Sequence, residues 1–93
     1  MEEELVFKTY YETQSEITKR LIQIRKNKKI SQKRLSVLSG VPYASIRRFE
    51  NTGDISFASL IKIAMALRLY NDLDSLFIPK EEYRSIEEAI NGK

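Results

Sequence analysis

The sequence predicts an all-α fold in which five short helices enclose one core. Apolar residues recur every three or four positions along most of the chain, and this spacing places them on one face of a helix. Serines that can cap helix starts and glycines that can end helices divide these stripes into short segments. At 93 residues the chain has room for one small domain with a single core.

The composition argues against several kinds of site. The chain has no cysteine and no histidine, which removes disulfides, thiolate chemistry and the usual zinc ligands. Its three glycines are scattered and form no phosphate-binding loop. Taken together, these absences lead us to expect no enzymatic activity, no metal and no cofactor. No apolar run approaches the length of a membrane span, and the start MEEELVFK lacks the features of a signal peptide. A cytoplasmic location is therefore expected.

The N-terminal residues 1–12 form a predicted arm whose structure the sequence leaves open. Three glutamates precede Leu5, Val6, Phe7, Tyr10 and Tyr11, and the segment could be a β-strand, a helical extension or a loose arm. The first helix is predicted to begin near Thr13 or Ser15 and to end at about Lys28. Its inward stripe would consist of Ile17, Leu21 and Ile24.

Two short helices that meet at Gly40 are predicted between residues 31 and 51. Ser31 can cap the first of them, in which Leu35 and Leu38 form the inward stripe. Gly40 ends this helix because glycine readily adopts a left-handed backbone conformation. Two short helices joined in this way are typical of the helix-turn-helix motif that binds DNA.

The second helix of this pair, residues 42–51, is the predicted recognition helix. Pro42 suits its first turn, and its apolar face is formed by Val41, Ile46 and Phe49. The residues left to point outward are Tyr43, Ala44, Arg47 and Arg48. A face with two guanidiniums, a tyrosine and a small alanine can approach base edges and phosphates in a major groove.

The remaining helices complete a predicted domain of residues 13–78. Ser56 caps a fourth helix with Leu60, Ile63, Ala64 and Leu67 on its apolar face. Asn71 or Asp72 could cap a short fifth helix that holds Leu73, Leu76 and Phe77. Residues 79–93 are either one more amphipathic helix, with Tyr83, Ile86 and Ile90 on one side, or a tail that becomes ordered against a partner. Without repeats or a linker, no second domain is expected.

The net charge of +3 conceals a strong segregation of charge. Residues 17–49 carry ten basic and no acidic side chains, whereas the segments before and after them have net charges of −4 and −3. A basic run alone is usually a solvated helix face. Here it coincides with the helix-turn-helix, so two independent criteria point to a polyanion.

With these features placed, residues 17–77 resemble the Cro and repressor type of helix-turn-helix, also called the xenobiotic-response-element family. Members often have a glutamine at the start of the second helix, a glycine at the turn and a glutamate that closes the third helix; these are Gln32, Gly40 and Glu50. The resemblance implies a five-helix, lambda-repressor-like DNA-binding domain. It also implies a structural ion pair between Arg25 and Glu50.

The same resemblance assigns DNA-binding roles to individual residues. Ser31 and Gln32 would approach a backbone phosphate, whereas Tyr43, Ala44 and Arg48 fall where family members read bases. Apart from the resemblance, Lys33 is expected to contribute a sequence-independent DNA contact. Arg47 and Asn51 fall where either bases or phosphates are met, and Thr52 and Gly53 lie in a loop that often offers amides to phosphate. Pro42, Tyr43 and Ala44 depart from the family pattern, because members often have a hydroxyl residue at the cap and amides after it.

Three functional hypotheses follow. The first is a repressor that binds double-stranded DNA as a homodimer on an inverted repeat, with candidate dimer contacts at Phe7, Tyr10, Tyr11, Tyr70, Leu73 and Phe77, although for Leu73 and Phe77 core packing is the favoured alternative. The second is a protein-interaction module in which the DNA surface is secondary, and the acidic ends of the chain support it. A narrower resemblance belongs to the DNA-binding hypothesis. The run IRRFENTGDISFASLIKIAMAL resembles HipB-like antitoxins, which implies a toxin partner of the HipA type and repression of the protein's own operon. An enzyme is the third and the least supported.

Overall fold

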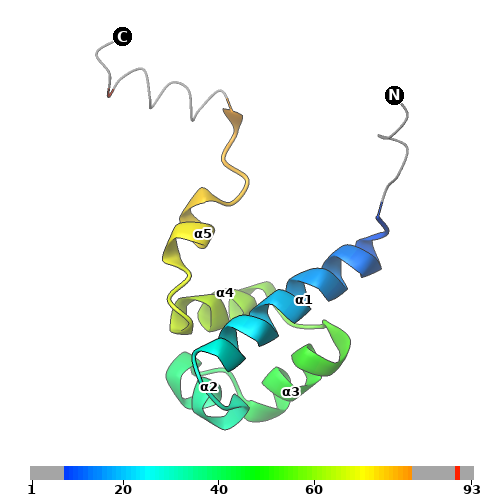
Figure 1. The fold of residues 1–93 in the computed structure, drawn as a ribbon, viewed down its shortest axis with the longest axis vertical. Helices are drawn as coiled ribbons and strands as arrows, with labels where there is room; N and C mark the ends of the chain where they lie inside the picture. Colours follow the sequence, from blue (N-terminus) through cyan, green and yellow to red (C-terminus); the bar gives the residue numbers. More distant parts are fainter. Residues whose placement is uncertain (1–7, 81–89, 91–93) are drawn as a thin grey trace.

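A computed structural model describes residues 8–80 and residue 90, and within that part of the chain five helices and no strand are present. They are α1 (Tyr10–Asn27), α2 (Gln32–Ser39), α3 (Tyr43–Thr52), α4 (Phe57–Ala66) and α5 (Tyr70–Ser75). The predicted five-helix, all-α fold is confirmed. Figure 1 shows α2 and α3 together at one end of the molecule, with α1 and α4 above them and α5 leading away from α4. None of the described helices is both long and apolar enough to span a bilayer.

Helix α1 begins earlier than the sequence analysis predicted. The backbone amide of Glu12 donates to Thr9 Oγ1, and the amide of Thr9 donates to Glu12 Oε1, both at 3.0 Å. This capping box starts the helix at Tyr10, so the expected start near Thr13 or Ser15 was wrong. Tyr10 and Tyr11, predicted to lie in the arm, are therefore in the first turn of α1. The expectations for residues 1–7 lie outside the described residues.

An exposed ion pair joins Lys8 to Glu16 of α1. Lys8 Nζ donates to Glu16 Oε1 at 2.7 Å. This hydrogen bond from the lysine lowers the pKa of the Glu16 carboxyl from its ordinary value.

The ends of α2 and α3 agree with the local signals in the sequence. Ser31 Oγ accepts a hydrogen bond from the Arg34 amide at 3.0 Å, and Gly40 ends α2 with a φ of 78°. Pro42 lies at the N-cap of α3, just before its first turn, and makes no side-chain capping bond. Its carbonyl accepts from the amides of Ser45 and Ile46, which begins the helical hydrogen bonding. Gly53, with a φ of 85°, ends α3.

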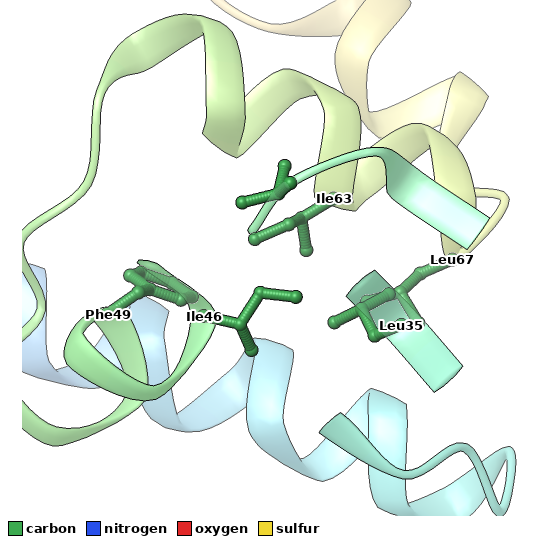
Figure 2. Close-up of a cluster of buried hydrophobic side chains, with 6 residues drawn as sticks. Leu35, Ile46, Phe49, Ile63 and Leu67 are labelled. Carbon is green, nitrogen blue, oxygen red and sulfur yellow. The ribbon is translucent and has the colours of Figure 1, made fainter. Parts of the chain in front are cut away.

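The core lies where α2, α3 and α4 meet, as Figure 2 shows. It consists of Leu35, Val41, Ile46, Phe49, Ile63 and Leu67, all of which the periodicity had placed on inward faces. Leu21 and Ile24 of α1 pack against it from the other side, and α1 contacts α3. Burial of these side chains is the main stabilising contribution to the position of α3.

Three residues predicted to face inward are exposed. Leu38, at the last turn of the short helix α2, is 44% exposed, and Ile17, in the half of α1 that extends away from the core, is 42% exposed. For Phe77, core packing was favoured over a dimer contact, but the residue is 89% exposed. It lies beyond the end of α5 and has a left-handed φ of 60°. Helix α5 also begins at Tyr70, after Leu69, rather than after Asn71 or Asp72. Of the three tail residues, only Ile90 is described, and it is exposed; the others lie outside the described residues.

Candidate nucleic-acid interface

A buried ion pair joins the helix-turn-helix to α1. Arg25 Nε donates to Glu50 Oε2 at 2.8 Å, and Arg25 Nη2 donates to Glu50 Oε1 at 2.9 Å. The two side chains are 9% and 8% exposed. Arg25 Nη1 also donates to the carbonyl of Ile30, in the turn before α2, at 2.8 Å. Because the pair is bidentate and shielded from water, it fixes both the distance and the orientation between α1 and α3.

Gln32 extends this pair to α2. Its Nε2 atom donates to Glu50 Oε1 at 2.7 Å, so the Glu50 carboxylate accepts bonds from two helices besides its own. The side chain of Gln32 is half-buried. The predicted approach to phosphate therefore has to use its second amide proton or its backbone, because the first proton is already bonded.

Tyr43, the first residue of α3, lies between the two helices of the motif. Lys33 Nζ of α2 lies over its ring, 5.7 Å from the centroid, and Arg47 Cζ of α3 lies 5.8 Å from the same centroid. Each such cation–π contact contributes about 0.5–1 kcal/mol at an exposed site. The spacing of four residues between Tyr43 and Arg47 could have predicted their contact. The contact with Lys33 could not be read from the sequence, because it depends on how α2 packs against α3.

Arg48 has a carboxylate neighbour that the sequence analysis did not identify. Its Nη2 atom lies 3.5 Å from Asp54 Oδ2, and both side chains are largely exposed, so the pair is weak. Asp54 follows Gly53, whose left-handed conformation reverses the chain direction after α3. No helical spacing relates these two residues, and only the turn brings them together.

The loop after α3 has its hydrogen bonds satisfied within the protein. The Gly53 amide donates to the Phe49 carbonyl at 2.7 Å, and the Gly53 carbonyl accepts from Gln14 Nε2 of α1 at 2.7 Å. Thr52 Oγ1 donates to the Arg48 carbonyl and accepts from the Asp54 amide. The Gly53 amide is therefore already bonded within the protein, and a contact between this loop and phosphate stays a prediction. Asn51 is exposed on the last turn of α3.

The basic segment of residues 17–49 forms an exposed surface. Nine of its ten basic side chains are exposed, and Arg25 is the exception. Within residues 8–80, only two of those nine have a carboxylate within ion-pairing distance: Arg20 near Glu16 and Arg48 near Asp54. Ala44 is also exposed, beside Tyr43 at the beginning of α3. The C-terminal end of α1, the first turn of α2 and the outer side of α3 therefore present positive charge that can attract a polyanion.

A helix-turn-helix family model matches residues 21–70, which is more than half of the chain. The chain belongs to the helix-turn-helix family of the Cro/repressor type. This helix-turn-helix protein is accordingly a DNA-binding transcriptional regulator. The matched residues include all of α2, α3 and α4. They also include the hydrogen-bonded group of Arg25, Glu50 and Gln32, and Tyr43 with the two cations over its ring. No curated protein matches the chain.

Proposed function

We propose that this helix-turn-helix protein is a repressor that binds an inverted-repeat operator as a dimer, with α3 in the major groove. The observation that carries the proposal is the separation of charge around the motif. Glu50 is neutralised inside the domain by Arg25, whereas Lys33, Arg34, Arg47 and Arg48 remain exposed on α2 and α3. Cations displayed on a rigid pair of helices suit a phosphate backbone.

The helix-turn-helix arrangement suggests which end of α3 reaches the bases. In this motif the N-terminal residues of the recognition helix contact base edges, while the preceding helix crosses the backbone. Tyr43 and Ala44 begin α3 and would lie deepest in the groove, with Arg47 and Arg48 one turn later. Ser31, Gln32 and Lys33 begin α2 and would approach phosphate, as Asn51 and Thr52 would at the far end of α3.

Exposed apolar side chains support a contact with a second protein chain. Along α4, α5 and the segment that follows, Met65, Tyr70, Leu76, Phe77 and Ile78 are each at least 39% exposed. Tyr10 and Tyr11 are exposed at the start of α1, while Leu73 is half-buried. A second copy that covers the surface near α5 would provide the two recognition helices that an inverted repeat requires.

Operator geometry tests the dimer directly. We expect light scattering at micromolar concentration to give the mass of two chains, and the protein to bind two half-sites best when their centres are about 34 Å apart. Inserting half a helical turn between the half-sites should abolish cooperative binding. A monomer both free and on DNA, with affinity independent of spacing, would contradict the dimeric model.

Repression is a separate claim and needs its own measurement. With the operator placed over a promoter in a reporter strain, expression of the protein should lower the reporter signal. Arg48→Ala should restore the signal without lowering the amount of folded protein. An increase in the reporter signal with the wild-type protein would identify an activator instead.

An antitoxin role is the second candidate, and the same exposed apolar surface supports it. A toxin could cover Phe77 and its neighbours in place of a second copy. The test is co-expression with the product of the adjacent gene. Co-purification that is lost on deleting residues 80–93, together with restored growth of cells that express the partner, would favour the antitoxin. Absence of a complex would leave the repressor as the better proposal.

A further inference from the structure

The outward side of the first two turns of α3 combines hydrogen-bond donors with apolar groups. Its side chains are Tyr43, Ala44, Arg47 and Arg48, so it contains neither a carboxamide nor a carboxylate. Guanidinium groups only donate, so among these four exposed side chains the Tyr43 hydroxyl is the single acceptor; Ser45, in the same two turns, is half-buried. The Asp54 carboxylate lies beside the Arg48 guanidinium at 3.5 Å, and the Glu50 carboxylate of α3 is bonded to Arg25 inside the domain. This composition restricts the base edges that the helix can recognise.

Each base presents different groups in the major groove. Adenine and cytosine present amino donors, which require an acceptor on the protein, and a carboxamide makes the usual paired contact with adenine. Guanine presents two acceptors, and thymine presents one acceptor and a 5-methyl group. Donors and apolar groups therefore suit guanine and thymine and cannot make the paired contact with adenine.

Of the two exposed apolar groups at the beginning of α3, Tyr43 and Ala44, Tyr43 offers the larger side chain for a methyl contact. It begins α3, and 36% of the residue remains exposed. Lys33 and Arg47 lie over its ring at 5.7 Å and 5.8 Å, which restrains the ring before any DNA arrives. A side chain that is already restrained loses little conformational entropy on binding, so more of the contact energy appears as affinity.

We infer that α3 selects half-sites that combine guanine with a pyrimidine carrying a 5-methyl group, and that the restrained ring of Tyr43 is the specificity-determining contact with this methyl. The inference deepens the proposed function and rests on its placement of α3 in the major groove. Thymine and 5-methylcytosine share the methyl group, and the experiment separates them.

The test uses duplexes that the full chain enriches from a randomised library. Each thymine in the enriched site is replaced by deoxyuridine, which removes only the methyl group. At one position or more in each half-site, we expect binding to weaken about fourfold, the ratio that corresponds to burying one methyl group. At the same position, 5-methylcytosine paired with guanine should bind more tightly than cytosine paired with guanine if the methyl is recognised in both bases. A preference for thymine alone would assign the contact to thymine.

Protein variants identify the residue that senses the methyl. Tyr43→Ala should remove the difference between thymine and deoxyuridine, whereas Tyr43→Phe should retain it because the ring is kept. Arg48→Ala is the matched control: it should weaken binding overall and leave the methyl difference unchanged. Circular dichroism and thermal melting would verify that each variant is folded.

The outcomes separate this inference from the proposed function. Enrichment of a sequence that tolerates deoxyuridine at every position would overturn the inference alone, as would full methyl sensitivity in Tyr43→Ala. Enriched sites in which adenine is the most strongly selected base on the contacted strand would also overturn it. A library from which no sequence is enriched would overturn the proposed sequence-specific function as well.

Discussion

Arg25 and Glu50 carry opposite charges, but their side chains are almost entirely shielded from water. Taking two charges out of water is costly, so such a pair is a weak source of net stability and a strong source of geometric definition. The carboxylate is bonded by Arg25 and Gln32, and the guanidinium also reaches the Ile30 carbonyl. Removing one partner leaves the other as a buried charge without a counterpart. This lowers stability more than replacing both residues with apolar ones does.

We therefore expect Glu50→Ala to lower the free energy of unfolding by about 3 kcal/mol, since an uncompensated buried charge costs roughly 3–5 kcal/mol. The double variant Arg25→Met with Glu50→Leu should recover much of this loss because it leaves no buried charge. Urea denaturation followed by circular dichroism measures both. If Glu50→Ala were as stable as the wild type, Arg25 would have to be solvated in the folded state.

The two glycines with left-handed conformations allow a matched comparison. A Cβ atom at Gly53 would lie 3.2 Å from Gln14 Cγ, whereas one at Gly40 would meet nothing within 4 Å. Both alanine variants should lose about 1–2 kcal/mol through backbone strain. Gly53→Ala should lose more than Gly40→Ala, because Gln14 must also move away from the Gly53 carbonyl. Thermal melting of the two variants tests this order, and equal losses would show that Gln14 shifts without cost.

At the scale of helices, capping residues explain which boundaries the sequence could predict. Ser31 and Gly40 delimit α2, and both act as expected. The start of α1 was missed although its signal, Thr9 followed three residues later by Glu12, is visible in the sequence. Helix α5 has no side-chain cap, so no local signal marked its start at Tyr70.

The capping role of Ser31 gives a prediction for α2, which has only eight residues. Ser31→Ala removes the bond to the Arg34 amide and should lower stability by about 1 kcal/mol. Ser75→Ala is a suitable control, because the hydroxyl of Ser75, the last residue of α5, donates to the carbonyls of Asn71 and Asp72 and caps no helix start. Its loss should stay within about 0.5 kcal/mol. Chemical denaturation of both variants tests the difference. An equal loss in both would exclude a special role for the cap.

Helical periodicity identified the buried apolar residues, but it also assigned to the core some residues that are exposed. Every buried apolar residue of α2, α3 and α4 lay on a predicted stripe, yet Leu38 and Ile17 lay on stripes as well and are exposed. An apolar stripe indicates which side of a helix faces the core, but the packing of neighbouring helices determines how much of the length of that stripe is buried. In the same way, the acidic neighbour of Arg48 and the cations over Tyr43 depend on tertiary contacts that periodicity does not contain.

At the scale of the whole molecule, charge is sorted along the chain more strongly than the net value of +3 suggests. Within the basic segment, Lys33, Arg34, Arg47 and Arg48 are exposed on α2 and α3. Long-range attraction of this kind increases the rate at which a polyanion is encountered. It also makes affinity dependent on the salt concentration.

DNA affinity should therefore fall steeply with salt. Counterion release predicts a slope of about −0.9 per phosphate contacted in a plot of log affinity against log salt concentration. Lys33→Ala should make the slope less steep by about 1 per chain and weaken binding to all sequences. Lys62→Ala, an exposed change on α4 outside the basic segment, should leave the slope unchanged. Binding isotherms at several salt concentrations provide the measurement, and a flat response in the wild type would exclude groove binding through these cations.

The bonds that Glu50 makes with Arg25 and Gln32 join α1, α2 and α3 in the protein without DNA. The recognition helix α3 therefore does not have to fold or to change its orientation when the protein binds an operator. Association should behave as the docking of a rigid body, in which the change in heat capacity reflects the apolar surface that is covered and contains no contribution from coupled folding. A protein built in this way loses no affinity to ordering its own motif.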